Sequence, residues 1–599
     1  MAHGSKKVLN DDLNLDLRVV NEIYGNGLSE NYGVSTSGGL AVPNQFFPAN
    51  SVDDLQKNYY YNYGYNGITY PGSQTRNNKT IGVAGILNLN YKEYLNLELT
   101  GRNDWLSTLT YPYGTPGANN YSVFYPSVNI AYGFYDQFKA DMPNWLSSGR
   151  LRASLAYVGN AGVAGPYATG AGYAPGTIYN NGNQTVGSAA QINADVKPNF
   201  DLKPQRQRSL EFGTNFGLLK EFINVDLTYY KTNTFNQLLY VPSVLETGYS
   251  RSFLNFGNIQ NQGLELLVNI TPIRTGEWNW NVAVNLAHNK SKIVNLGFGI
   301  KEWELSGGYD GANVWAYEGG DFGVLTSDIG ASSKKDPATG FPILQVSSRY
   351  TNTNPNVKFD IADYALVNPD YSDAQKRIAI GKIEPDLTGG ISSTLRYKNF
   401  NLFTQVDGRF GGYVYSEALS YASGQGTSIN TLNFRDQEHG GVARTDSYTG
   451  QTRYDGVIPN AVFDKGQTSP LKPGIDIGGM TFRQAYDQGL VEPWKASLYY
   501  NGWYGYGTNL NGNETASKNS WIMLREITLN YRIPNSILDK AHIKGARIGF
   551  SARNIGYLYR TLANGQNPES IQSNDPFRPY ITGGVPFYRN YSVNLNISL

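Results

Sequence analysis

Residues that could take part in catalysis are few and scattered along this chain. The four histidines, His3, His288, His439 and His542, lie far apart, and none has the spacing of a metal ligand set. Cysteine is absent, which excludes disulfides, Cys-ligated zinc and thiol catalysis. His288 precedes Ser291 closely enough to suggest a hydrolase pair, but a turn or interior role is the simpler explanation. We therefore expect a protein that is not an enzyme.

Aromatic residues offer binding chemistry instead. The runs NYYYNYGYNGITY (58–70) and GWYGYG (502–507) are rich in rings whose apolar faces could stack on sugar rings. Such loops more often pack on one another or on a partner, so ligand contact is one of two readings. The candidate ligand-binding residues are Tyr59, Tyr60, Tyr61, Tyr63, Tyr65, Trp503 and Tyr504.

Charged residues are balanced overall and spread along the chain. Lys and Arg number 49 against 48 Asp and Glu, which gives no argument for a nucleic-acid partner. Acidic pairs such as Asp11–Asp12 and Asp53–Asp54 carry the oxygen ligands of calcium, although a solvated turn explains them as well. No cofactor is required by any of these patterns.

The elements that must position these residues are β-strands. The final segment RNYSVNLNISL (589–599) alternates apolar and polar residues, as a strand with one greasy and one wet face does. The same period recurs in about 14 segments, most of them about as long as a tilted bilayer-crossing strand. The expected strands lie near 13–19, 81–91, 95–102, 122–134, 149–158, 210–216, 223–229, 264–270, 278–286, 385–397, 400–411, 521–532, 546–555 and 589–599. Helical periodicity is nearly absent, with one short candidate at 534–542.

The connections between these strands alternate between short and long. The long loops are expected at about 23–78, 159–204, 235–260, 292–384, 412–515 and 556–588. Short periplasmic turns and long extracellular loops are typical of outer-membrane barrels, and aromatic residues gather near the strand ends as girdles do. A soluble propeller or sandwich would have shorter strands and similar loops at both ends. The pattern therefore predicts an all-β transmembrane antiparallel barrel with a periplasmic C-terminus.

If one face of each strand lines a wet interior, its charges are the best functional candidates. A water-filled barrel needs a polar interior in any case, so a single such residue indicates little by itself. The residues predicted to face the lumen, or to hold a plug by ion pairs, are Arg102, Asp104, Arg152, Arg208, Glu211, Arg396, Arg409, Arg525 and Arg553.

Several blocks resemble SusC/RagA-type TonB-dependent outer-membrane transporters of Bacteroidetes. NYKEYLNLELTGRNDWLSTL (90–109) is similar to that family's "gR-D-S" strand pair, and FYPSVNIAYGF (124–134) is similar to its "FPSvslGW" strand. WIMLREITLNYRIP (521–534) and NPES (567–570) resemble its "fLRl" and "DPE" blocks. Further blocks match in the same order at 151–162, 199–239, 256–269, 284–297 and 546–560. Asn103, Trp105 and the terminal Leu599 depart from the usual family pattern.

The resemblance implies a place for this chain within a larger transporter. Family members carry a signal peptide, a TonB box, a plug domain and a barrel of about 22 strands. This chain resembles the C-terminal barrel portion, so the plug and about eight strands are expected upstream of Met1 or on another chain. The implied partners are a SusD-like surface lipoprotein, TonB–ExbB–ExbD acting through the plug, and outer-membrane lipid. Calcium could sit in the loops or on the lipoprotein lid.

Members of this family import glycan fragments or peptides. The resemblance therefore predicts that this chain is the barrel portion of such an importer. The alternative is a passive or scaffold outer-membrane barrel that recruits other envelope proteins.

Overall fold

The computed structural model of the chain describes most of its 599 residues. The described residues are 1–30, 74–110, 119–160, 173–179, 185–192, 196–197, 199–242, 246, 249, 251–297, 299–308, 312–327, 334–346, 364–367, 377–446, 449–504, 515–539, 542–562, 564–571, 577–583 and 587–598. They divide into two compact units, which are treated separately below. Unit 1 comprises Met1–Pro143, Ser148–Thr214 and Tyr230–Gln260, and unit 2 comprises Asn144–Ser147, Asn215–Tyr229 and Asn261–Leu599.

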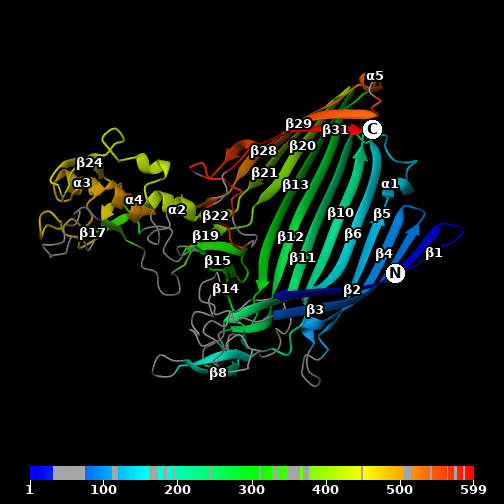
Figure 1. Cartoon of the computed structure of the whole chain (residues 1–599), viewed down its shortest axis with the longest axis horizontal. Coiled ribbons are helices and arrows are strands. Elements are labelled where there is room, and N and C mark those ends of the chain that lie inside the picture. The colour runs from blue at the N-terminus through cyan, green and yellow to red at the C-terminus, as the bar shows by residue number, and fades with distance from the viewer. Residues whose placement is uncertain are drawn as a thin grey trace, which may run out of the picture. The chain divides into compact units, whose positions relative to one another are not determined.

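One 16-stranded sheet contains all the segments expected from the alternating pattern (Figure 1). Its order is β1-β2-β3-β4-β5-β6-β10-β11-β12-β13-β20-β21-β28-β29-β31, and the short β9 pairs with β12. The strands on this path are β1 (Ala2–Val8), β2 (Leu13–Glu30), β3 (Gln74–Tyr91), β4 (Leu95–Leu106), β5 (Ser122–Tyr132), β6 (Leu146–Asn160), β10 (Gln205–Leu218), β11 (Ile223–Pro242), β12 (Arg251–Arg274), β13 (Trp278–Asn295), β20 (Leu387–Tyr397), β21 (Phe400–Phe410), β28 (Trp521–Arg532), β29 (Gly545–Arg560) and β31 (Asn590–Ser598). The expected all-β antiparallel architecture is confirmed, with β1 as an additional strand that its small and polar residues concealed.

The strand register places apolar and charged side chains in separate rows. In unit 1, Leu15, Leu89, Leu97 and Ile130 are mutual partners across β2, β3, β4 and β5. One residue away, the partners are Asp16, Asn88, Glu98 and Asn129, and Asn129 Nδ2 donates to Glu98 Oε1 over 2.8 Å. Successive side chains on a strand point to opposite faces, so the sheet has one apolar and one polar face.

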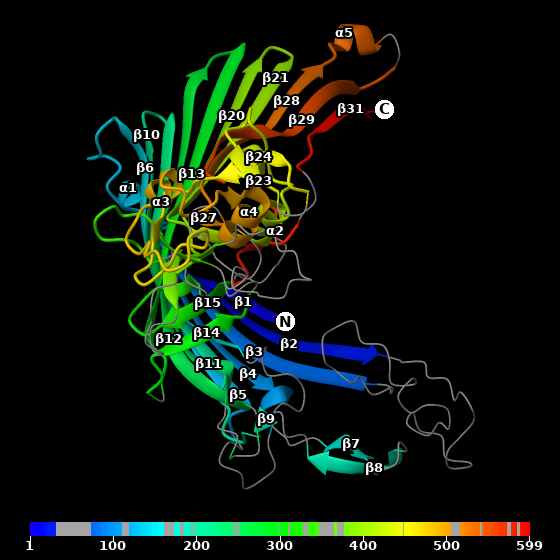
Figure 2. The ribbon, with the colours of Figure 1, turned by 90° about the vertical axis from the view of Figure 1, so that its left-hand side faces the viewer.

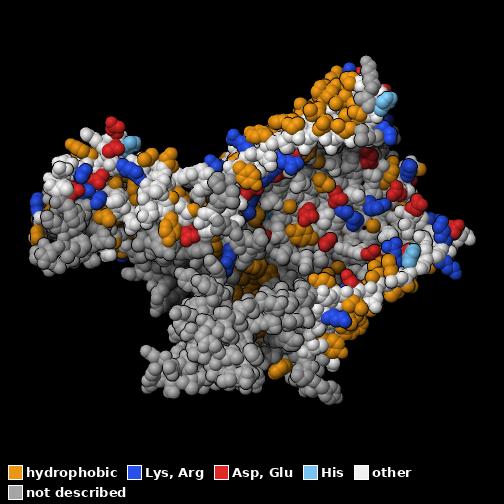
Figure 3. Space-filling view, in the orientation of Figure 1, with side chains coloured by type: hydrophobic (Ala, Val, Ile, Leu, Met, Phe, Trp, Pro, Cys, Tyr) orange, Lys and Arg blue, Asp and Glu red, His pale blue; other side chains and the backbone are white. Residues whose placement is uncertain are grey.

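Unit 2 repeats this division. Leu402 on β21 pairs with Leu529 on β28, Leu529 with Phe550 on β29, and Phe550 with Val593 on β31. Phe550 and Val593 are 49% and 70% exposed, and exposed apolar side chains in a continuous row indicate a surface that contacts another apolar phase. In Figure 3, hydrophobic side chains gather over β29 beside α5, and acidic and basic ones over β4, β5 and β6.

Short and long connections lie at opposite ends of the strands. The short ones are residues 9–12, 92–94, 133–145, 219–222, 275–277, 398–399 and 533–544. At the three-residue connection 92–94 the backbone takes a positive φ, 48° at Lys92 and 63° at Glu93, which matches the twist of a hairpin. Of the remaining connections on the path, 31–73, 107–121, 161–204, 296–386, 411–520 and 561–589 are longer, and 243–250 is short. The alternation expected from the sequence is therefore present except between β11 and β12.

The strands run further into the expected loops than the sequence suggested. β2 and β3 remain paired to Glu30 and Gln74, well past the end of β4 (Figure 2). Residues 235–260 belong largely to β11 and β12, and only 243–250 connect them. The loop bounds at 23–78 and 235–260 were therefore too wide. These strand ends pair small polar residues, such as Asn26 with Asn78, which leave no apolar alternation to detect.

The two longest expected loops, 292–384 and 412–515, contain much regular structure. Their strands and helices, with the remaining short elements, are η1 (Ser107–Leu109), α1 (Phe134–Gln137), β7 (Tyr173–Tyr179), β8 (Thr185–Ile192), β9 (Val196–Lys197), β14 (Glu302–Ser306), β15 (Ala312–Tyr317), β16 (Phe322–Ser327), β17 (Ile343–Val346), β18 (Tyr364–Leu366), β19 (Ile378–Lys382), β22 (Tyr413–Ser416), α2 (Glu417–Gly424), η5 (Ile429–Leu432), β23 (Val442–Thr445), β24 (Thr452–Val457), β25 (Val462–Phe463), α3 (Phe482–Asp487), β26 (Trp494–Lys495), α4 (Ala496–Tyr504), β27 (Ala516–Lys518), α5 (Asn535–Leu538) and β30 (Tyr580–Ile581). The expected helix near 534–542 exists as α5, whereas α2, α3 and α4 were not foreseen.

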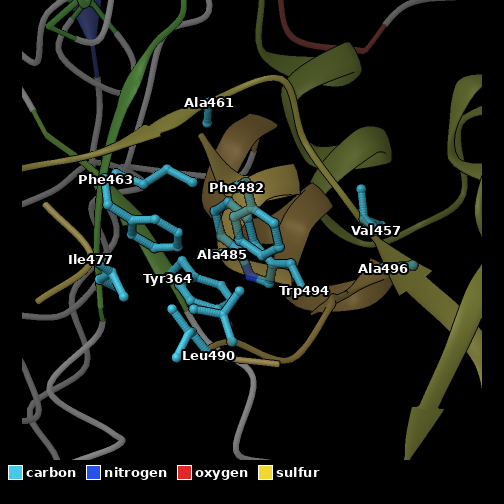
Figure 4. Packing of buried hydrophobic residues seen from close by; sticks show 12 residues of the cluster. Tyr364, Val457, Ala461, Phe463, Ile477, Phe482, Ala485, Leu490, Trp494 and Ala496 are labelled. Carbon is cyan, nitrogen blue, oxygen red and sulfur yellow. The ribbon is translucent and has the colours of Figure 1, made fainter. Parts of the chain in front are cut away.

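A hydrophobic core separate from the main sheet lies within these connections. We call the residues that form and surround it, 343–346, 364–366 and 434–504, the loop module. Tyr364 meets Phe482 edge to face at 4.9 Å between ring centroids and Trp494 at 5.6 Å, as Figure 4 shows. The Tyr364 hydroxyl donates to the Glu492 carbonyl over 2.7 Å. Thr481 and Gln484 form a capping box at the start of α3. The module thus has a buried centre of its own. Among the described residues, no helix has the length and apolar character needed to cross a bilayer.

Candidate functional site

The polar face of unit 1 holds a charged cluster on β2, β4 and β5. Arg102 Nε donates to Asp104 Oδ1 over 2.7 Å, and Arg102 Nη1 donates to Glu22 Oε2 over 3.0 Å. The Tyr125 hydroxyl donates to the second oxygen of Asp104. Asp104 and Tyr125 are both buried, at 9% and 8% exposure. A buried carboxylate requires such partners, and here a guanidinium and a phenol supply them.

Strand register explains why these side chains meet. Glu22 is opposite Gly82 on β3, and Gly82 is opposite Asp104 on β4. Arg102 is opposite Tyr125 on β5, two residues from Asp104 and therefore on the same face. A Cβ at Gly82 would overlap both the Arg102 guanidinium and the Asp104 carboxylate. The missing side chain at this position leaves room for Arg102 to reach across β3 to Glu22.

This cluster has a charge left over on its exposed side. Arg102 and Asp104 neutralise each other, while the Glu22 side chain is 59% exposed and also pairs with Arg102. Two carboxylates against one guanidinium leave a net negative charge on this part of the polar face. Such a site can accept a basic group without rearranging the buried pair.

The polar face of unit 2 holds a second cluster around Arg525 on β28. Val406 pairs with Leu524 and Gln405 with Glu526, so Arg525 is an extra residue with no direct partner on β21. A β-bulge of this kind lets two consecutive side chains turn toward one face. Glu526 accordingly accepts from Arg553 Nε on β29 over 3.1 Å, while Arg525 Nε donates to Asp407 Oδ2 over 2.6 Å.

Arg525 also reaches the connection that follows β29. Its Nη2 and Nη1 donate to the two carboxylate oxygens of Glu569 over 2.7 and 3.1 Å, and Nη1 donates to Asn554 Oδ1 over 3.1 Å. The Tyr557 hydroxyl donates to Asn567 Oδ1 over 2.6 Å. The structure therefore joins two blocks that stand apart in the sequence, the Leu524–Arg525 block and the NPES block.

The remaining predicted lumen residues have separate surroundings. Arg409 Nη2 donates to the Ile383 carbonyl over 3.3 Å, and Arg208 lies 5.8 Å from the Phe235 ring centroid. Glu211 accepts from the Ser209 hydroxyl over 3.0 Å.

Two further arginines lie elsewhere on the sheet. Arg152 lies above Gly213, where an added Cβ would press against its guanidinium. Arg396 is an exposed residue of β20 that pairs in the ladder with Asn279 and Asn401. The nine predicted residues thus form two clusters and several isolated positions.

The side chains of the predicted ligand-binding aromatics all lie outside the described residues. Tyr59, Tyr60, Tyr61, Tyr63 and Tyr65 lie outside the described residues. Trp503 and Tyr504 form the last turn of α4, but their side chains are outside the described set as well. Their role in ligand contact stays a prediction.

Sequence reasoning missed Glu22, Tyr125 and Glu569 as members of the clusters. Tyr125 and Glu22 carry the right parity on their strands, but only the register brings them to Arg102 and Asp104. Glu569 belongs to a recognised sequence block and was not connected to Arg525, because a folded connection supplies it. The sequence offered only the odd or even position of each residue on its strand, which indicates the face of the sheet on which its side chain lies and not the residue that it contacts.

The candidate hydrolase pair makes two unrelated sets of contacts. His288 Nδ1 lies 2.6 Å from the Asp386 carbonyl. The Ser291 hydroxyl and its backbone N–H both donate to Glu384 over 3.0 Å. His288 and Ser291 are an odd number of residues apart on β13, so their side chains point to opposite faces. The serine hydroxyl faces a carboxylate and not an imidazole.

Asp12, from the proposed calcium pair, is 3.3 Å from Lys92 Nζ.

The fold and these clusters define a class of protein. A large antiparallel sheet with one apolar face, one charged face and unequal connections at its two ends is the wall of a membrane β-barrel. The model of the family "TonB dependent receptor-like, beta-barrel" matches residues 5–372, more than half of the chain. The chain belongs to this family, and the resemblance stated from its sequence blocks is confirmed.

Individual relatives agree with this assignment. TonB-dependent receptor P3 of Formosa agariphila is 23% identical over 558 residues, which cover 88% of this chain and 46% of the relative. TonB-dependent receptor SusC of Bacteroides thetaiotaomicron is 22% identical over 317 residues, covering 51% of this chain and 29% of the relative. A solved structure of the RagAB peptide transporter matches 99% of this chain and 54% of its own, with a TM-score of 0.64 and 18% identity. The chain thus spans about half the length, or less, of the proteins it matches.

Proposed function

We propose that this chain forms part of the barrel wall of an outer-membrane importer that TonB drives. The observation that carries the proposal is the division of the sheet into an apolar and a charged face, present from β2 to β5 in unit 1 and from β21 to β31 in unit 2, in a member of the TonB-dependent receptor family. The apolar face would contact outer-membrane lipid, and the charged face would line the interior. In this proposal the chain moves a ligand and performs no chemistry on it.

The proposed mechanism assigns a part to each end of the strands. The long connections would lie outside the cell, where a SusD-like lipoprotein closes over a glycan fragment or a peptide. The short turns and the C-terminal end of β31 would lie in the periplasm. Support comes from the unequal connections and from the similarity to SusC and to the fold of a peptide transporter. Calcium in the loops or on the lid, and stacking by the loop tyrosines, stay predictions.

The proposed barrel is completed by strands and a plug outside this sheet. The strand order begins at β1 and ends at β31, and among the described residues neither outer edge has a partner strand. Unpaired backbone groups are not tolerated in hydrocarbon, so these edges must pair with other strands. We propose that an upstream segment or a second chain supplies about eight strands and the plug through which TonB–ExbB–ExbD acts. The negative charge at Glu22 would receive a basic group of that plug.

The alternative function is a passive or scaffold barrel. The loop module favours it, because a folded platform with its own core can recruit another envelope protein without any transport. The two functions differ in whether TonB is needed.

Uptake measured in cells separates them. Cells that carry this chain with its completing strands should accumulate a labelled oligosaccharide or oligopeptide mixture, and accumulation should cease when TonB is deleted or the proton gradient is collapsed. A matched strain with Glu22→Gln would test the plug contact. Recovery of a surface lipoprotein with the chain, without any TonB-dependent uptake, would support the scaffold and contradict the importer.

A further inference from the structure

The connection between β29 and β31 is bound to three other parts of unit 2. We call residues 564–571 and 577–583 of this connection the strap. NPES (567–570), a block that the sequence singled out, lies in its first half. Tyr580 and Ile581, which form β30, lie in its second half.

The first half of the strap is anchored to the wall. Glu569 receives two hydrogen bonds from Arg525, as described above, and the side chain of Asn567 receives one from Tyr557. The Pro568 carbonyl accepts from Asn519 Nδ2 over 2.9 Å, and Asn519 is fully buried. Charged and buried hydrogen bonds of this kind hold a segment firmly.

The second half is built into the long connections. β30 pairs in parallel with β22, through Tyr415 with Tyr580 and Ser416 with Ile581. The Tyr580 hydroxyl donates to the Ala312 carbonyl over 3.0 Å, in a buried position. Phe577 meets Phe322 edge to face at 5.0 Å. Residues far apart in the sequence are thus joined through a few strap side chains.

Two hydrophobic clusters depend on the strap. Tyr580 packs with a buried group drawn from β15, β16, β22 and β27, whose members are Ala312, Val314, Leu325, Tyr415 and Ala516. Ile581 packs with Val414 and Leu562. The connections 296–386 and 411–520 therefore both pack on the second half of the strap, and the Glu569 anchor to Arg525 lies in its first half.

We propose that the strap fixes both long connections to the wall and that Arg525 and Glu569 are its positioning residues. Arg525 is shared between Asp407 and Glu569. Loss of the Glu569 charge leaves Arg525 paired with Asp407, so the wall keeps its ion pair. The strap loses its ion pair and keeps the hydrogen bonds of Asn567 and Pro568. The proposal concerns the placement of the connections and does not depend on which ligand the barrel handles.

A thiol-accessibility experiment tests this directly, because the natural chain has no cysteine. Ala516 is fully buried against Tyr580, and Ala516→Cys introduces one thiol there. In the chain assembled in detergent with its completing strands, Glu569→Gln should raise the maleimide-labelling rate of this cysteine by about tenfold, through more frequent local opening. The matched control is Glu526→Gln, which removes the neighbouring carboxylate on β28 that pairs with Arg553 on β29 and not with the strap.

Two further variants separate release of the strap from general unfolding. Ala485→Cys places a thiol in the buried core of the loop module, which makes no use of the strap, and its labelling rate should not change with Glu569→Gln. Tyr580→Phe should raise labelling at position 516 as well, because it removes the bond to Ala312 and leaves the ring. The proposal is wrong if Glu569→Gln and Glu526→Gln have equal effects, or if Glu569→Gln accelerates labelling at both cysteine positions. Gel mobility of the unheated protein confirms a folded sheet in every variant.

Discussion

Gly82 shows how a residue without a side chain shapes the charged face of the sheet. Its neighbours across the ladder are Glu22 and Asp104, and Arg102 occupies the space that a Cβ would need. Neither the glycine nor the arginine is informative alone. Together they produce a buried, charge-paired site from four strands, which a face-by-face reading of the sequence cannot show.

Replacement of Gly82 by alanine should therefore destabilise the sheet. The added methyl group overlaps the ends of the Arg102 and Asp104 side chains, which must then shift and lose hydrogen bonds to each other and to Glu22. Loss of buried hydrogen bonds of this kind costs about 1–3 kcal/mol. Gly85→Ala, on the same strand, meets no atom within 4 Å and should change the unfolding free energy by less than about 0.5 kcal/mol. Urea unfolding of detergent-folded protein measures both. Equal destabilisation would contradict the packing described for Gly82.

The Tyr125 hydroxyl should matter in the same cluster. Tyr125→Phe leaves the buried Asp104 without one donor, and an unsatisfied buried group of this kind costs about 1–3 kcal/mol. Tyr132→Phe is the control, because its hydroxyl bonds to Gln137 at an exposed site. The same urea titration decides between them, and a larger loss for Tyr132→Phe would refute the assigned role of Tyr125.

At the level of elements, the loop module is the main departure from an ordinary set of loops. Its core is formed by Tyr364, Phe463, Phe482 and Trp494, which come from different strands and helices. The ring of Phe463 stacks on that of Phe482 at 5.4 Å. A buried aromatic cluster of this size gives the module cohesion that does not rely on the main sheet.

Trp494→Ala should unfold the module and leave the sheet intact. Removal of a fully buried tryptophan costs about 3–5 kcal/mol, which is large for so small a core. Limited proteolysis should then cut within 434–504, while the unheated gel mobility that reports the sheet stays unchanged. Tyr454→Ala, at a position 45% exposed in the same module, should leave the cleavage pattern as it is. Protection of 434–504 in the tryptophan variant would show that the core is not needed.

The strands were predictable from the sequence because one face of each strand is apolar and the other face is polar. Leu15 and Asp16 are adjacent in the chain and lie on opposite faces of the sheet, so the sequence alternates between apolar and polar residues. The ends of β2 and β3 were not predictable, since Asn26 and Asn78 pair where neither face is apolar. The helix α3, of 6 residues, is too short to show a 3.6-residue period. The partners of Arg102 and Arg525 depend on register and on a folded connection, which no local pattern contains.

For the molecule as a whole, the two faces of the sheet set its relation to lipid. Val593 and Asn594 are adjacent on β31 and belong to the apolar and polar faces. The same charge should therefore have opposite consequences at these two positions.

Val593→Lys should impair folding into lipid bilayers, where a lysine on the lipid face costs up to about 2–4 kcal/mol. Asn594→Lys should be tolerated, because its side chain lies on the polar face. The folded fraction in phospholipid vesicles, read from heat-dependent gel mobility, compares the two. A tolerated Val593→Lys with a damaging Asn594→Lys would reverse the assignment of faces.

The edges of β1 and β31, to which no strand of the described residues is paired, also govern how fast a closed wall can form. Sequential neighbours pair along the main sheet, so hairpins with short connections can assemble with little loop-closure entropy, and those joined by 296–386 and 411–520 cost more. Closure is the remaining step, and its reaction order depends on where the completing strands reside. Strands on the same polypeptide would close the wall at a rate independent of concentration. Strands on a separate polypeptide would make closure bimolecular, so that the yield of closed barrels rises with the supply of the partner and the open edges persist until it arrives.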